Sequence, residues 1–393
     1  MQDLNPFKLE RFLAEHEFRA RYFLSPSDCE SLSQRELLAL SDDECRALWE
    51  NLTLGYTESQ GHPVLRAEIA RLYPALSAES ILVLTPEEGI FIAMLSLLRP
   101  GDRVVAIAPA YQSLHEIARG IGCEVALWPM VESEAGWEAD IDHLARLLAP
   151  RTRLLIINFP HNPTGYLPRR EVLDAVLPLA RKHDLCVFSD EMYRGLEYSS
   201  SQRLPAVAEI FERGVSLSGL SKTQGLAGLR IGWLATQSRD LMAQWLKLKD
   251  YTTICHSAPS EVLALMALRA GKRITARNLA IIQSNIVHAT LFFSRHPALF
   301  SWVPPRAGST AFPRWVGPEP VEEFCHHALE SQDVLVVPGS MFDMPGRHFR
   351  IGLGRRSFPD ALEVLGRVLE SRGRHAGDES FRTFDGGESH ESR

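Results

Sequence analysis

Short apolar runs alternate with amphipathic stretches through the middle of the chain. Runs such as 81–84 (ILVL) have the length and branched side chains of buried strands. The stretches between these runs repeat apolar positions with helical spacing. The predicted strands lie at 81–84, 103–108, 123–127, 153–158, 185–189, 214–217 and 230–235, and the predicted helices lie at 87–98, 113–120, 140–149 and 169–183. This alternation predicts an α/β fold with a mostly parallel sheet covered by helices on both faces.

The two ends of the chain have a different pattern. The sequence predicts a helix at 7–24, a polar loop at 25–33, a capped helix that ends near residue 49, and a helix that begins at Pro63. A long helical stretch at 238–294 is expected to break near 252–259. Strands at 311–315, 334–337 and 349–353 and a helix at 358–371 are expected to follow it. Residues 372–393 lack apolar periodicity and predict a disordered tail.

These elements predict more than one domain, because 393 residues are too many for one small core. We expect an N-terminal segment at 1–49 that packs with the smaller domain and a large ligand-binding domain at 50–285. A small α+β domain at 286–371 and the tail at 372–393 complete the predicted organisation. Ligands of open parallel sheets bind at the carboxyl ends of the strands, so functional residues are expected there.

Composition and charge exclude several classes of protein. Hydrophobic residues make up 45% and charged residues 23% of the chain, which is typical of a soluble globular protein. A net charge of -7 and the lack of a basic run argue against a nucleic-acid or acidic-membrane partner. Six cysteines without CxxC spacing indicate neither a disulfide framework nor a metal site. The chain shows no signal peptide and no apolar membrane span, so a cytoplasmic location is expected.

The candidate chemistry centres on Lys222, in the stretch SLSGLSKTQGLAGLRIG at 216–232. Small and apolar neighbours can keep this lysine partly desolvated, which lowers its pKa and frees the amine to attack a carbonyl. Ser218, Ser221 and Arg230 supply anion-binding groups nearby. Together these groups suit an aldehyde that carries a phosphate, and pyridoxal 5′-phosphate (PLP) is that molecule. Taken alone, the Ser-Lys pair favours the alternative that Lys222 is a solvated loop lysine.

Other polar residues follow the ends of the predicted strands. Asn162 lies in the turn NFPHNPTG, which is rigid enough to hold an amide against a phenolic oxygen. Asp190 ends an apolar strand and Tyr193 follows in SDEMY, although singly they could be a helix cap and a core tyrosine. Arg350 follows an apolar run in HFRIGLGR, where a surface arginine is the alternative.

The order of these residues resembles that of the class I/II aminotransferases, which are PLP-dependent enzymes of fold type I that act in amino-acid metabolism. The similarity extends over roughly residues 50–370. The resemblance implies that Lys222 forms the internal aldimine with the cofactor and moves the proton at the substrate Cα. It implies that Asp190 pairs with the pyridine nitrogen, and that Asn162 and Tyr193 hydrogen-bond the ring 3′-oxygen. Tyr111, in PAYQS, would stack on the ring.

The same resemblance implies contacts with the cofactor phosphate and the substrate. Arg230 would bind the phosphate with help from Ser221 and Ser218. Tyr56, in GYTESQG, matches a tyrosine that reaches the phosphate of the neighbouring subunit, which implies a homodimer with shared active sites. Arg350, with Asn162 beside it, would bind the substrate α-carboxylate through two hydrogen bonds.

The predicted phosphate-binding turn departs from the family pattern. Relatives carry Gly, Ser or Thr there, whereas this chain reads TPEEG at 85–89. Pro86 has no N–H to donate, and the carboxylates of Glu87 and Glu88 would repel a phosphate unless they point away. Their backbone N–H groups at a helix N-terminus could still bind it. Gly219 also stands where many relatives have serine.

The reaction expected by default is transfer of an amino group from an L-amino acid to a 2-oxo acid. Stretches at 247–261, 305–315 and 334–342 more closely resemble the capreomycidine synthase-like branch, which closes a ring on an arginine-derived amino acid. Asp28, Glu30, Glu87 and Glu88 suit a cationic substrate tail if they border the pocket, but each could be a solvated or helix-capping acid. A third possibility is a PLP-binding protein without catalysis.

Overall fold

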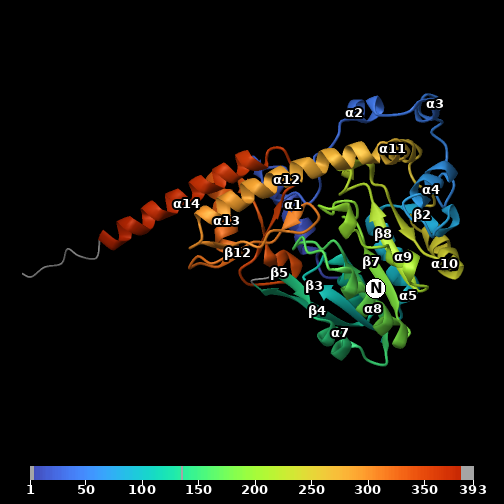
Figure 1. The fold of residues 1–393 in the computed structure, drawn as a ribbon, viewed down its shortest axis with the longest axis horizontal. Coiled ribbons are helices and arrows are strands. Elements are labelled where there is room, and N and C mark those ends of the chain that lie inside the picture. Colours follow the sequence, from blue (N-terminus) through green and yellow to red (C-terminus); the bar gives the residue numbers. More distant parts are fainter. Residues whose placement is uncertain (1–3, 134–135, 382–393) are drawn as a thin grey trace, which may run out of the picture.

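The centre of the computed structural model, which describes residues 4–133 and 136–381, is an eight-stranded sheet (Figure 1). The strand order is β2-β9-β8-β7-β6-β3-β4-β5. The strands are β2 (Ile81–Leu84), β3 (Arg103–Ala108), β4 (Glu124–Ser133), β5 (Gly136–Ala139), β6 (Thr152–Asn158), β7 (Cys186–Asp190), β8 (Gly214–Gly219) and β9 (Gly232–Ala235). The five strands from β4 to β8 along this order are parallel, and β2, β9 and β5 form antiparallel pairs. The predicted mostly parallel sheet is confirmed.

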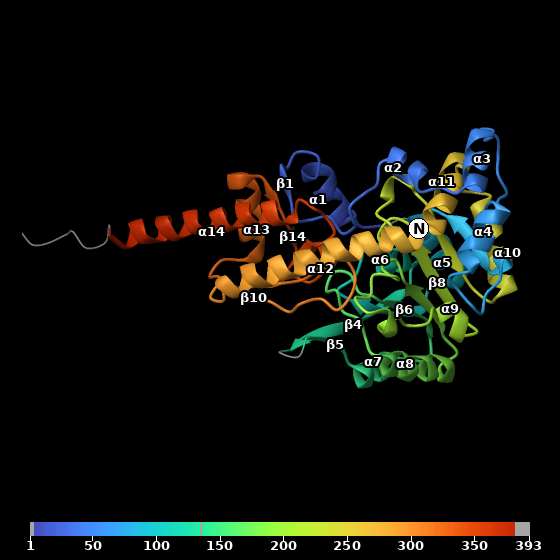
Figure 2. The same cartoon turned by 45° about the horizontal axis from the view of Figure 1, so that its top comes forward.

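Helices cover both faces of this sheet (Figure 2). Val104 and Ala106 of β3 pack into one buried cluster with α5 and α6, whereas Val105 and Ile107 pack into another with α7 and α8. Both faces are therefore apolar, as in other parallel sheets. The helices around the sheet are α4 (Pro63–Ala70), α5 (Pro86–Leu97), α6 (Ser113–Ile121), α7 (Ile141–Leu147), α8 (Arg170–Lys182), α9 (Val207–Ile210), α10 (Arg239–Lys249) and α11 (Ala258–Arg269).

A smaller α+β unit lies beside the large sheet, and α12 extends along both parts (Figures 1 and 2). Its main sheet has the order β11-β15-β14, and β1 pairs in parallel with β13. Its elements are β1 (Tyr22–Phe23), α12 (Gly271–Arg295), β10 (Phe300–Ser301), β11 (Thr310–Ala311), β12 (Arg314–Trp315), α13 (Val321–Gln332), β13 (Val334–Leu335), β14 (Val337–Pro338), β15 (Phe349–Gly352) and α14 (Phe358–Phe381). The domain boundary predicted after residue 285 falls inside the continuous helix α12.

The N-terminal segment contains α1 (Lys8–His16), α2 (Gln34–Ala39) and α3 (Asp43–Glu50). Polar contacts hold the start of α1 on α6. The side-chain amide of Asn5 donates to Glu116 at 2.6 Å, and the Lys8 N–H donates to Gln112 at 2.9 Å. Gln112 in turn donates to the Pro6 carbonyl. Because α6 begins two residues after Tyr111, these contacts fix α1 beside the carboxyl ends of the strands.

Several predicted elements have different limits in the structure. The helix predicted at 7–24 ends at His16, because residues 22–23 satisfy their backbone groups by pairing with β13. The helix predicted up to residue 49 is two helices, since Asp42 caps a new start by accepting the Cys45 N–H at 2.8 Å. The strand predicted from residue 230 begins at Gly232, because Arg230 has a left-handed backbone with φ of 56°.

Other differences concern strand pairing and the C-terminus. The strand predicted at 123–127 continues to Ser133 and forms an unpredicted hairpin with β5. The strands predicted at 311–315 and 334–337 are each two short strands that pair with different partners. Part of the predicted tail continues α14 to Phe381, because extending a formed helix costs little, and residues 382–393 lie outside the described residues. Within the described ranges, no helix is long and apolar enough to cross a membrane.

Candidate active site

A cavity of about 380 Å³ lies at the carboxyl ends of the central strands, between the large sheet, α1 and the segment 25–28. Its volume falls in the range of small-molecule sites, roughly 300–1,000 Å³. The predicted site residues that line it are Asp28, Glu87, Tyr111, Asn162, Asp190, Tyr193, Ser221, Lys222, Arg230 and Arg350. The fold therefore gathers residues that are far apart in the sequence.

Lys222 lies three residues after the end of β8, and its amine points to the N-terminal segment. The Nζ atom donates a hydrogen bond to Ser27 Oγ at 2.7 Å. Burial lowers the pKa of Lys222, and the nearby Arg350 guanidinium lowers it further, while Asp28 and other acids oppose this shift. A lysine with a lowered pKa carries a larger fraction of free amine near neutral pH. Lys222 can therefore act as a nucleophile toward a carbonyl in this cavity.

Asp190 is the last residue of β7 and is buried at the floor of the cavity. One carboxylate oxygen accepts the Met192 N–H at 3.0 Å. Burial raises the pKa of Asp190 to about 6, which the hydrogen bond from Met192 and the charge of Lys222 partly oppose. A buried acid with one hydrogen bond can pair with a cationic ring nitrogen, which would hold it ionised.

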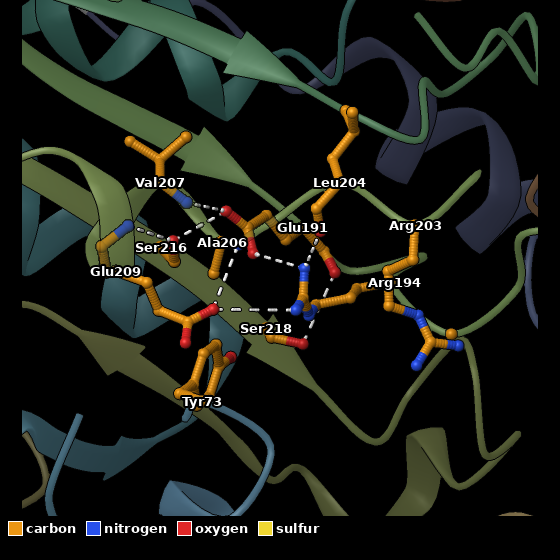
Figure 3. A network of polar contacts seen from close by, with 12 residues as sticks. Tyr73, Glu191, Arg194, Arg203, Leu204, Ala206, Val207, Glu209, Ser216 and Ser218 are labelled. Atoms are coloured by element: carbon orange, nitrogen blue, oxygen red, sulfur yellow. Dashed lines mark hydrogen bonds and ion pairs between the residues drawn. The ribbon is translucent and has the colours of Figure 1, made fainter. Parts of the chain in front are cut away.

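A polar network beside this strand end holds the turn from Asp190 to Tyr193 (Figure 3). The Glu191 carboxylate accepts a hydrogen bond from the Val207 N–H at 3.0 Å and one from Ser216 Oγ at 2.7 Å. Arg194 lies 4.0 Å from Glu191 and 3.9 Å from Glu209, and it donates to the Leu204 carbonyl. The turn is thus tied to β8 and α9, which restrains the side chains of Asp190 and Tyr193.

Arg350 of β15 is 1% exposed and reaches the cavity from the smaller unit. Its Nη2 donates to the Ser25 carbonyl at 3.0 Å, and its Nη1 lies 3.4 Å from Asn162 Oδ1. The guanidinium carbon lies 5.0 Å from the centre of the Phe342 ring. The Nε atom has no hydrogen-bond partner among the described residues. A buried guanidinium with an unused donor suits the carboxylate of a ligand.

The Asn162 turn is shaped by backbone constraints. Asn162 N donates to Asn158 Oδ1 at 2.8 Å, and Gly165 closes the turn with φ of 67°. A Cβ atom on Gly165 would lie 2.3 Å from Pro305 and 2.5 Å from the Thr310 carbonyl, so only glycine fits. The turn therefore holds the Asn162 amide close to Arg350.

Two tyrosines link the cavity to the N-terminal segment. The Tyr193 hydroxyl donates to the Ser27 carbonyl at 2.9 Å. The Tyr111 hydroxyl donates to Glu10 of α1 at 2.7 Å. Burial raises the pKa of both phenols well above the ordinary value, so both remain protonated donors near neutral pH.

Arg230 adopts a backbone conformation that non-glycine residues seldom adopt, at a cost of about 1–3 kcal/mol. Its carbonyl accepts hydrogen bonds from Thr85 Oγ1 at 3.2 Å and from His256 Nε2 at 2.7 Å. His256 Nδ1 accepts the Ser257 N–H, so one ring nitrogen donates and the other accepts, as in a neutral imidazole. Burial lowers the pKa of His256 in agreement with this state. These contacts fix Arg230 next to the start of α5 and Ser221.

Some predicted residues lie outside the cavity lining. Ser218 follows Leu217, which lines the cavity, so alternation along the strand turns Ser218 to the other face, where it joins the network of Figure 3. The Glu88 carboxylate accepts from Thr253 at 2.8 Å. Glu30 accepts from the Arg356 N–H. Tyr56 is 90% exposed, and its predicted role concerns a neighbouring subunit.

Apart from Asp28, the residues of the N-terminal segment that line the cavity were not among the predicted site residues. Glu10 and Glu17 project from α1 and its C-terminal end, and Ser25 and Ser27 follow in the next segment. Glu10, Leu13 and Glu17 have the spacing of one helical face, and all three line the cavity. This spacing could have predicted that the three residues share a helical face. The nearby sequence does not tell which part of the protein this face contacts.

The comparison with known families agrees with this geometry, since the model of aminotransferase class I and II matches residues 30–358. The chain belongs to this family. It is 31% identical to capreomycidine synthase of Streptomyces vinaceus over 378 residues, which are 95% of this chain and 96% of that protein. Members of this family depend on PLP, so PLP is the cofactor of this protein.

Two solved structures share this fold. A PLP-dependent aminotransferase from Streptococcus suis has a TM-score of 0.87 and 31% identity, and the match covers 94% of this chain and 99% of that one. The PLP-dependent cyclase OrfR has a TM-score of 0.86 and 31% identity, with 95% and 99% covered. The fold is therefore that of the fold type I PLP-dependent enzymes.

The residues of the cavity fit this cofactor. Asp190 has one carboxylate oxygen engaged by Met192, which leaves the other for a ring nitrogen. Arg230 and Ser221 line the cavity next to the N-terminus of α5, where an anion is favoured. Arg350 Nε and the Ser25 hydroxyl are buried and have no hydrogen-bond partner in the part of the chain that the structure describes, so a ligand would satisfy them.

Proposed function

We propose that the protein is a PLP-dependent aminotransferase for an L-amino acid with a cationic side chain of the arginine type. The observation that carries this proposal is Glu17. Its carboxylate is half-buried at the cavity and has no ion pair or hydrogen bond among the described residues. Burial raises the pKa of Glu17, and the charges of Asp28 and Glu10 raise it further. A cationic group placed there would relieve this unfavourable clustering of acids.

The acids Asp28, Glu10 and Glu17 differ in the groups that already pair with their carboxylates. Arg355 Nη2 donates to both carboxylate oxygens of Asp28, at 2.8 and 2.9 Å. Among the described residues, Glu10 accepts a hydrogen bond from the Tyr111 hydroxyl alone and forms no ion pair. Glu10 and Glu17 therefore remain to bind a guanidinium, while Arg350 binds the α-carboxylate. The polarity of the cavity thus supports a substrate with its carboxylate near Arg350 and its cationic tail near α1.

The other residues have roles that follow from their positions. When bound, PLP supplies an electron sink for the bond broken at Cα. The Lys222 amine, whose pKa is lowered, takes the proton from the substrate Cα and passes it to a carbon atom of the cofactor. Asp190 keeps the pyridine nitrogen protonated, and the Tyr193 hydroxyl supplies a hydrogen bond to the ring oxygen. Leu9, Glu10 and Leu13 of α1 form part of the cavity wall.

A second candidate function is elimination and ring closure on an arginine-derived amino acid. The similarity to capreomycidine synthase over nearly the whole chain and the TM-score of 0.86 to the cyclase OrfR favour it. The same acids of α1 would then bind the guanidino group. The two functions differ in the fate of the amino group, which leaves the substrate in one reaction and stays in the other.

The test is a substrate panel with the full-length protein loaded with PLP. Arginine, hydroxyarginines, lysine, alanine and aspartate would be supplied with and without 2-oxoglutarate, and products would be identified by mass spectrometry. We expect a 2-oxo acid from arginine or a close analogue, formed only with the acceptor. A cyclic product from a hydroxyarginine without acceptor would reject transamination in favour of the second candidate. Faster turnover of aspartate than of arginine would contradict the cationic substrate, and no turnover of any kind would favour a non-catalytic protein.

The proposal includes a homodimer. Tyr56 and the nearby Leu54 are 90% and 86% exposed, as is Tyr251 at 86%. Exposed large apolar side chains of this kind suit an interface between copies of the chain, from which Tyr56 would reach the neighbouring phosphate. Sedimentation at the concentrations used for activity should give the mass of two chains, and an active monomer would contradict the shared site.

A further inference from the structure

The start of α5 poses an electrostatic problem for a bound phosphate. Two glutamates, Glu87 and Glu88, occupy the first turn of this helix, where the backbone would bind the anion. Carboxylates close to a phosphate repel it in a site with little water. The structure gives the two side chains different surroundings, and only one of them avoids the phosphate end of the cavity.

The Glu88 side chain points away from the cavity. It accepts hydrogen bonds from the hydroxyls of Thr252 and Thr253 and lies 3.9 Å from the buried amine of Lys249. The two hydroxyls hydrogen-bond one oxygen of the Glu88 carboxylate, and the Lys249 amine offsets its charge. Glu87, by contrast, lines the cavity on the side of α5. Its negative charge would face the same space as the phosphate.

The groups that face Glu87 come from several elements. The carboxylate of Glu10 on α1 and that of Asp190 on β7 raise its pKa, while the nearby Ser113 hydroxyl and the Arg230 guanidinium lower it. Burial is the largest cause, and it raises the pKa of Glu87 to about 7. The neutral acid is therefore well populated near neutral pH. A phosphate that arrives would stabilise it further, since another negative charge opposes ionisation.

We propose that Glu87 binds the PLP phosphate as a neutral carboxylic acid that donates its proton in a hydrogen bond to a phosphate oxygen. Cofactor binding then takes up one proton at Glu87. This inference rests on the proposed position of the phosphate beside α5 and Arg230. It explains how a turn with two acids binds an anion, because Glu88 turns away and Glu87 loses its charge.

The sign of the pH dependence follows from this proton. Below the pKa of Glu87 the donor is present, and above it the carboxylate repels the phosphate. Between pH 6.5 and 8.5, the affinity for PLP should fall roughly 20-fold through this group, given a pKa of about 7. The window starts at pH 6.5 because Asp190 titrates near 6. Lys222 and the phosphate itself also titrate. Because they do so in every variant, their effect on the affinity cancels when variants are compared at the same pH.

The experiment measures the dissociation constant of PLP by absorbance titration of the cofactor-free full-length protein from pH 6.5 to 8.5. Wild type is compared with Glu87→Gln, which keeps an N–H donor without titrating, and with Glu87→Ala, which has neither. Glu171→Gln is the matched control, because Glu171 holds the same second position in α8 and is exposed. Pyridoxal, which lacks the phosphate, is titrated in parallel, and thermal melting checks that each variant is folded.

We expect the affinity ratio of Glu87→Gln to wild type to rise roughly 20-fold across this window with PLP and to stay constant with pyridoxal. Glu171→Gln should follow wild type, and Glu87→Ala should bind PLP more weakly than Glu87→Gln at every pH. A constant ratio with PLP would overturn the role of Glu87 while leaving the proposed function intact. A ratio that rises equally with pyridoxal would also overturn it, because the proton would then not serve the phosphate. Failure of wild type to bind PLP at any pH would reject the proposed function itself.

Discussion

Replacing Arg350 by Ala removes the guanidinium that we assign to the substrate α-carboxylate. The side chain is 1% exposed, and Ser25 and Asn162 engage only its Nη atoms, so Nε is free for a ligand. A carboxylate bound through two charge-assisted hydrogen bonds gains roughly 1.5–3 kcal/mol from each. Their loss amounts to about 3–6 kcal/mol, which lowers kcat/KM roughly 100- to 20,000-fold. Most of this loss should appear in KM, because the carboxylate is bound before and during the reaction.

The assay compares the best amino-acid substrate with its α-amide, which lacks the negative charge. Wild type should strongly prefer the acid, and Arg350→Ala should lose most of that preference while its turnover of the amide changes little. Bound-cofactor absorbance should be retained. Arg314→Ala serves as the control, because Arg314 is an exposed arginine of the same unit. An equal loss of activity on acid and amide, or loss of the cofactor absorbance, would refute the assignment of Arg350.

The remaining predictions concern Glu17, which we assign to the cationic group of the substrate, and Asp190, which we assign to the ring nitrogen of the cofactor. Glu17→Gln should raise KM for a cationic substrate roughly 5- to 30-fold, because it removes about 1–2 kcal/mol of a partly screened charge pair, and should leave KM for alanine unchanged. Equal effects on both substrates would contradict cation binding by Glu17. Asp190→Asn should lower kcat by about 100-fold or more with the cofactor still bound, because an amide cannot hold the ring nitrogen protonated. If kcat of Asp190→Asn, measured at saturating PLP, equals that of wild type, Asp190 does not pair with the ring nitrogen.

The sheet could be predicted because its strands are continuous apolar runs separated by helical periodicity. The residues at the strand ends followed from topology, since Asp190 ends a buried strand, Lys222 lies three residues after another, and parallel strands end at one edge. Burial of the whole strand β8 is also the reason why the orientation of Ser218 could not be predicted. All six residues of β8 are buried, so no alternation of polar and apolar positions tells which face meets the cavity.

The contribution of the N-terminal segment could not be predicted from local pattern. Its helix ends early because Tyr22 and Phe23 pair with a strand more than 300 residues away. Glu10 and Glu17 reach the cavity only because Asn5 and Lys8 are held on α6. Long-range contacts of this kind leave no trace in the spacing of nearby residues. The left-handed backbone of Arg230 likewise depends on contacts with Thr85 and His256.

The central claim is that the cavity beside Lys222 is the site where PLP is bound covalently. The most direct measurement is borohydride reduction of the PLP-loaded protein, which makes the bond to the lysine permanent, followed by peptide mapping with mass spectrometry. Lys249 is the sharpest alternative, because its side chain is also buried and burial lowers its pKa as well. We predict the cofactor mass on Lys222 alone. Cofactor found on Lys249, or on no lysine of a protein that turns over substrate, would contradict it.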